Sequence, residues 1–174
     1  MKEGRIRRPQ WEPTSRDVAL YFVLGLLFIG QIILCIIFYN WANLDWLLYL
    51  GFATLVGSFL VGGMSRRAFE EKGEAPDRKR WLQTTVVVDS GIYAVVRHPM
   101  YLSGILIIFA LMLISQHWLC AILGVPIMVY FYVSMRSEEK SNIEKFGDDY
   151  KAYMQRVPRM NFLLGVARLL RSRN

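Results

Sequence analysis

One short stretch of the chain concentrates residues that could do chemistry. Residues 91–104 read Gly-Ile-Tyr-Ala-Val-Val-Arg-His-Pro-Met-Tyr-Leu-Ser-Gly and lead into a long apolar segment, where polar groups are costly to bury. Pro99 suits the first turn of a helix, because its missing N–H would have no partner there, and it disfavours helical geometry for His98. We therefore expect Arg97 and His98 beside the free N–H groups of a helix start, where an anionic group of a ligand is stabilised.

The plainer alternative is a basic anchor at a membrane interface. Arg97 fits either role, because a long basic side chain can extend to the headgroups from a helix end. His98 fits the anchor less well, since anchoring does not require an imidazole.

A second polar group consists of Glu138 and Glu139, with Arg136 just before them. Carboxylates at this place could hold a cation, pair with Arg97 or accept a proton. The alternative is ordinary charge at a helix end, but acidic residues near a helix C-terminus oppose its dipole. A tight hairpin between the two groups would return the chain to its starting depth, so we expect His98 and Glu139 on opposite walls of one pocket.

The distribution of charge indicates a multi-pass membrane protein. The chain has 174 residues, of which 54% are hydrophobic, yet its formal net charge is +7. Its 21 Lys and Arg residues fall in three blocks separated by apolar stretches, which is typical of membrane spans and their loops. We therefore expect membrane lipids, and no nucleic acid, as partners.

Four apolar stretches could cross a bilayer, whose hydrocarbon core of about 30 Å needs about 20 helical residues. We predict spans at about 18–39, 46–64, 99–115 and 118–135, of which the third is short. All Lys and Arg lie on one side of this arrangement, so the positive-inside rule places both termini in the cytoplasm of a cell-membrane protein.

We predict an all-α integral membrane fold that forms one domain over residues 1–174. Gly147 should end the fourth helix, and Asp148 should be the N-cap of a short polar helix after it. Residues 162–173 mix Leu and Val with arginines, which favours a cytosolic amphipathic helix on an anionic leaflet. Cys35 and Cys120 lie inside apolar runs without a CxxC partner, so we expect neither a disulfide framework nor a metal site.

Ordered motifs fill residues 90–159. They are Gly91-x-Tyr93, Arg97-His98-Pro99-x-Tyr101-x-x-Gly104, Glu138-Glu139, Phe146-Gly147-x-x-Tyr150-x-x-Tyr153 and Val157-Pro158-Arg159. In this order they resemble the isoprenylcysteine carboxyl methyltransferase and phospholipid methyltransferase superfamily of integral-membrane enzymes. The first two spans carry none of the resemblance.

The resemblance implies S-adenosylmethionine as cofactor, in a cytosol-facing pocket between the last two membrane helices and the polar C-terminal helix. It also implies a lipidic acceptor, either a prenylcysteine carboxylate or the amine of a phospholipid headgroup. Arg136 or Arg97 could orient a carboxylate, whereas a carboxylate such as that of Glu139, or else His98, would accept the proton of an amine. The prenylcysteine enzymes have an arginine where this chain has Ser134. Carried across, the cofactor-binding residues are Tyr93, His98, Pro99, Tyr101, Gly104, Glu138 and Glu139.

Two other classes of protein remain open. Membrane sterol reductases share an Arg-His-Pro-x-Tyr motif and use NADPH, but the paired glutamates and the short chain argue against them. A non-enzymatic membrane scaffold would explain the spans and leave the polar cluster unexplained.

Overall fold

The structure is a computed structural model that describes residues 14–72 and 86–171. These residues form helices and no strand, which agrees with the predicted all-α class. The predicted basic N-terminal block, and part of the polar loop between the second and third predicted spans, lie outside the described residues. The helices are α1 (Ser15–Ile37), α2 (Asp45–Lys72), the short 3₁₀ helix η1 (Gly91–Ala94), α3 (Pro99–Ser115), α4 (Trp118–Phe146), α5 (Asp148–Arg156) and α6 (Phe162–Arg171).

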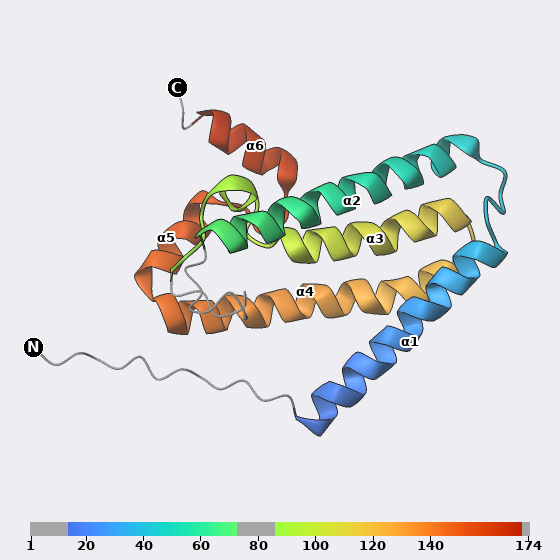
Figure 1. The fold of residues 1–174 in the computed structure, drawn as a ribbon, viewed down its shortest axis with the longest axis horizontal. Coiled ribbons are helices and arrows are strands. Elements are labelled where there is room, and N and C mark those ends of the chain that lie inside the picture. The colour runs from blue at the N-terminus through green and yellow to red at the C-terminus, as the bar shows by residue number, and fades with distance from the viewer. Residues whose placement is uncertain (1–13, 73–85, 172–174) are drawn as a thin grey trace, which may run out of the picture.

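The helices α2, α3 and α4 run side by side, and α1 crosses them obliquely (Figure 1). Helix α3 lies in the middle, because it packs against α2, α4 and α1. The turns α1–α2 and α3–α4 meet at one end, where the side chain of Gln116 donates to Asn40 Oδ1 at 2.7 Å and accepts from the backbone N–H of Leu44 at 3.0 Å. This end of the bundle is therefore tied by hydrogen bonds between its two turns.

In the part of the chain that the structure describes, three helices, α1, α2 and α4, are long and apolar enough to cross a membrane. The helix α3 is apolar but has 17 residues, so the third of the four predicted spans is present as a shorter helix. Small and polar residues hold α3 to its neighbours: Ser103 donates to the carbonyl of Ser58 at 2.8 Å, and the buried Gln31 donates to the carbonyl of Ile108 at 3.1 Å.

The helices continue beyond the predicted spans, since α2 extends to Lys72 and α4 to Phe146. Glu138 and Glu139 therefore lie inside α4, before its last turn, and the expected conflict with the helix dipole is weaker there. Gly147 ends α4 with φ +61°, as predicted. The N-cap prediction is wrong by one residue, because Gly147 occupies that place and Asp148 is already helical.

Candidate functional site

The motif loop, residues 91–98, comprises η1 and the residues that lead from it to the start of α3. Its Tyr93 is buried, and its hydroxyl lies 2.7 Å from the hydroxyl of Ser65 on α2. The hydroxyl of Tyr153 on α5 donates to the main-chain carbonyl of Tyr93, also at 2.7 Å. Burial raises the pKa of both Tyr153 and Tyr93, so both phenols stay protonated and can donate. The loop is thus held between α2 and α5.

A second set of bonds fixes the end of this loop. The N–H of Arg97 donates to the carbonyl of Pro158 at 3.0 Å, and the N–H of His98 donates to the carbonyl of Arg159 at 3.2 Å. His98 is the non-helical N-cap residue of α3 and Pro99 is in its first turn, as the sequence predicts. The chain after α5 therefore runs alongside the motif and fixes its backbone.

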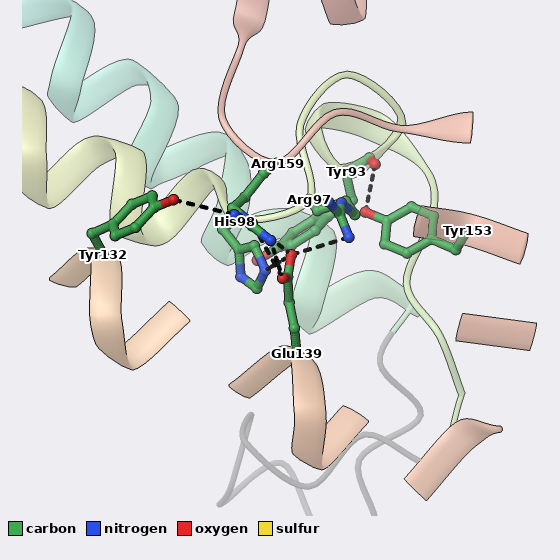
Figure 2. Close-up of polar contacts among 7 residues, drawn as sticks. All are labelled: Tyr93, Arg97, His98, Tyr132, Glu139, Tyr153 and Arg159. Atoms are coloured by element: carbon green, nitrogen blue, oxygen red, sulfur yellow. Dashed lines mark hydrogen bonds and ion pairs between the residues drawn. The ribbon is translucent and has the colours of Figure 1, made fainter. Parts of the chain in front are cut away.

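The side chains of Arg97, His98 and Arg159 surround Glu139, which is 4% exposed, and form a buried charge cluster (Figure 2). Arg159 is bidentate, with Nη2 at 2.6 Å from Oε2 and Nε at 3.0 Å from Oε1. His98 Nε2 lies 3.3 Å from the same Oε1. The prediction that His98 and Glu139 face each other across a pocket is therefore wrong, because the close packing of α3 on α4 makes them direct partners. The hydrogen bonds to Glu139 raise the pKa of Arg159, which stays charged.

We call Glu139 and its three partners, Arg97, His98 and Arg159, the Glu139 cluster. Arg97 has the fewest hydrogen bonds to the carboxylate of Glu139. Its Nη1 lies 3.0 Å from Glu139 Oε1, and its side chain is 8% exposed. By distance this is an ion pair, but the contact does not have hydrogen-bond geometry, and both Nη1 and Nε are buried without a hydrogen-bond partner. Because unpaired buried donors are costly, Arg97 has spare capacity to bind an anionic group.

A cavity of about 330 Å³ lies next to this cluster, a size typical of small-molecule pockets. Its wall is mostly aromatic and apolar, and it includes one carboxylate among the described residues, that of Glu138. A more polar hollow of about 530 Å³ shares part of this wall and adds Asp89, Asp149, Ala152 and Arg156. The cavity is lined by Phe69, Val86, Val87, Val88, Tyr93, Arg97, His98, Met100, Tyr101, Phe131, Glu138, Asn142, Lys145, Phe146, Tyr150 and Tyr153.

The predicted site residues divide into a lining set and a supporting set. Five line the cavity: Tyr93, Arg97, His98, Tyr101 and Glu138.

The supporting set lies behind the wall. Glu139 is paired with Arg97, His98 and Arg159, and Pro99 is buried at the start of α3. Gly104 allows the ring of Phe131 to approach, since a methyl group there would lie 2.8 Å from Phe131 Cε2. Arg136 is exposed and lines neither hollow, so the structure does not bring it to the other site residues.

Two kinds of site residue were missed from the sequence. Arg159 was noted in a motif without a role, and only the fold shows that it grips Glu139. Asn142, Phe146, Tyr150 and Tyr153 also line the cavity, and their spacing at three or four residues was the available signal. Among residues 14–72 and 86–171, no cluster of three or more His, Cys, Asp or Glu side chains could hold a metal ion.

Comparison with known proteins gives two matches. Residues 19–149 match the family model described as phospholipid methyltransferase, so the likeness to the family includes the first two predicted spans, in which no motif pointed to it. Methanethiol S-methyltransferase 1 of Bradyrhizobium diazoefficiens is 37% identical over 67 residues, which are 38% of this chain and 22% of that protein. The alignment thus covers less than a quarter of the relative's length. No solved structure matches the chain.

Proposed function

The chain belongs to the phospholipid methyltransferase family, and from this premise we propose that it transfers a methyl group from S-adenosylmethionine to a lipidic acceptor at the membrane boundary. The observation that carries the proposal is Arg97 in the wall of an aromatic cavity, with two buried donor nitrogens that have no hydrogen-bond partner and a single ion pair, to Glu139. A small ligand that carries a carboxylate and a flat ring system fits such a wall.

The residues of the cavity match the chemistry of this cofactor. Arg97 would bind its carboxylate by charge-assisted hydrogen bonds. The rings of Tyr101 and Phe146 offer faces for adenine and for the positive sulfonium. Glu138 and Asn142 offer acceptors for its ammonium group and its ribose hydroxyls.

When bound, S-adenosylmethionine supplies an electrophilic methyl group that an aligned nucleophile can displace in line. The chain contributes position and the exclusion of water, which are the main requirements of such a transfer. Glu139 and Arg159 hold Arg97 and His98 in place from behind the wall, so we assign Glu139 a positioning role. For an amine acceptor, Glu138 would accept the proton. Arg136 is outside the cavity, and we assign it no step.

A lipidic acceptor is supported by the place of the cavity in the fold. Its wall includes Met100 and Phe131, from the first turn of α3 and from the apolar part of α4. An acceptor embedded in the bilayer could reach this wall without leaving the membrane. The matched relative is named for methanethiol, so a small thiol is the acceptor to compare with lipids.

The proposal is tested by calorimetry with the purified chain in lipid nanodiscs. We expect saturable binding of S-adenosylhomocysteine and no binding of NADPH; binding of NADPH alone, or of neither, would contradict the proposal. Methyl transfer from radiolabelled S-adenosylmethionine is then measured for phosphatidylethanolamine, a prenylcysteine analogue and methanethiol. Equal rates for methanethiol and for the lipids would refute the lipidic acceptor.

A further inference from the structure

The helix α6 presents a row of large apolar side chains to the outside of the molecule. Leu163 is 81% exposed and Leu170 is 60% exposed. They are seven residues apart, so they lie on one stripe of the helix. Phe162 and Leu164 add further exposed apolar surface at 44% and 42%. An exposed apolar stripe of this kind is typical of a surface that is buried against a partner or a membrane.

Basic side chains accompany the stripe. Arg168 and Arg171 lie in the last turn of α6, and no acidic residue occurs in this helix. Arg168 makes a long hydrogen bond, at 3.5 Å, to the carbonyl of Gln155. Both arginines are exposed, on other faces of α6 than the stripe of Leu163 and Leu170. An apolar stripe with arginines on the remaining faces is typical of a helix that lies in the headgroup region of an anionic bilayer.

The position of α6 suits the same surface. It lies outside the bundle, oblique to α2 and α3, at the end where α4 leads into α5 (Figure 1). This is the end that carries the Glu139 cluster, opposite the turn where Gln116 binds Leu44. The apolar segments of α3 and α4 border on polar sequence here, so the bilayer surface lies within reach.

Close packing joins α6 to the motif loop. Gly165 is buried, and a methyl group in its place would lie 2.8 Å from the carbonyl carbon of Val95 and still closer to its oxygen. Only a glycine permits this approach. Val95 precedes Arg97, whose N–H binds the carbonyl of Pro158 just before α6. The loop is thus held by α6 itself and by the segment that leads into it.

We propose that α6 docks on an anionic lipid surface, and that this docking orders the motif loop for ligand binding. The occupant is a bilayer because one helix carries both an apolar stripe and exposed arginines, and it lies at one end of a bundle of membrane-length helices. The second part, on ligand binding, rests on the proposed function; the first part does not.

The docking test places a bimane fluorophore on Leu163→Cys in the full-length chain, whose own Cys35 and Cys120 are buried. Nanodiscs contain doxyl-labelled lipid with phosphatidylcholine alone or with increasing phosphatidylglycerol. We expect quenching to rise with phosphatidylglycerol. The double variant Arg168→Gln, Arg171→Gln should weaken docking roughly thirty-fold, at about a kcal/mol for each basic residue.

The matched control removes the same charge from exposed lysines outside α6, in the variant Lys140→Gln, Lys151→Gln. It should dock as the unmodified chain does. Quenching that ignores phosphatidylglycerol, or that falls equally in both double variants, would overturn the docking proposal. Protection of the label that depends on protein concentration would also overturn it, because a second copy would then be the cover.

The coupling test measures the affinity for S-adenosylhomocysteine in the same nanodiscs. We expect the α6 variant to bind more weakly than the lysine control when phosphatidylglycerol is present, and equally when it is absent. Docking with unchanged affinity would refute the coupling alone. Because quenching is recorded without any ligand, a chain that docks but binds no S-adenosylhomocysteine would contradict the proposed function and leave the docking result standing.

Discussion

Replacing either of the two adjacent glutamates with glutamine should change a different property: stability at Glu139 and ligand affinity at Glu138. Glu139 is buried and accepts from Arg159 and His98, whereas Glu138 is exposed at the cavity wall. Glu139→Gln removes a charge that offsets Arg97, which has no other anionic partner among the described residues. Loss of one partner of a buried ion pair costs about 3–5 kcal/mol. We expect the lower end of this range, because Arg159 is 31% exposed and solvent screens its share.

The assay compares Glu139→Gln with Glu138→Gln by thermal melting and by calorimetry with S-adenosylhomocysteine. Glu139→Gln should lower the melting temperature by roughly 10 °C. Glu138→Gln should leave melting unchanged and weaken binding by roughly ten- to a hundred-fold, the range of one charge-assisted hydrogen bond. The reasoning is refuted if Glu139→Gln melts like the unmodified chain, or if Glu138→Gln is the less stable of the two.

Three further predictions concern the tether of the motif loop and the topology. Arg159→Lys loses the bidentate grip and should cost about 1–2 kcal/mol in chemical unfolding, and no change would argue against the clamp. Tyr153→Phe loses the bond to the motif backbone and should cost about 1 kcal/mol, while the exposed control Tyr132→Phe should cost less; equal costs would count against the tether. Cysteine labels at Asn43 and Lys145 should react from outside and from inside the cell respectively, and a reversed pair would overturn the predicted orientation.

The sequence predicted the helix boundaries that are set by a single proline or glycine. The start of α3 follows from Pro99, and the end of α4 follows from Gly147, whose positive φ disfavours a side chain. The ends of the predicted spans did not give the ends of the helices. Hydropathy reports where the bilayer ends, whereas helical hydrogen bonding continues beyond it. For that reason α2 and α4 are longer than the predicted spans.

The sequence pointed to the cavity-lining residues that lie in one loop. It did not point to contacts between segments that are distant in the chain. His98 and Tyr101 line the cavity as their motif suggests. Glu138 and Glu139 could not be told apart, because successive residues of a helix face directions about 100° apart and only the packing of α3 on α4 decides which faces inward. Arg159 reaches Glu139 after the chain has reversed through α5, a path that no local pattern encodes.

We assign the carboxylate of S-adenosylmethionine to Arg97, and the proposed function depends on this assignment. It is tested most directly by measuring the affinity for S-adenosylhomocysteine and for its analogue that lacks this carboxylate, in the unmodified chain and in Arg97→Gln. We expect the carboxylate to contribute roughly ten- to a hundred-fold to affinity in the unmodified chain and almost nothing in the variant. An equal contribution of the carboxylate in both proteins would contradict it.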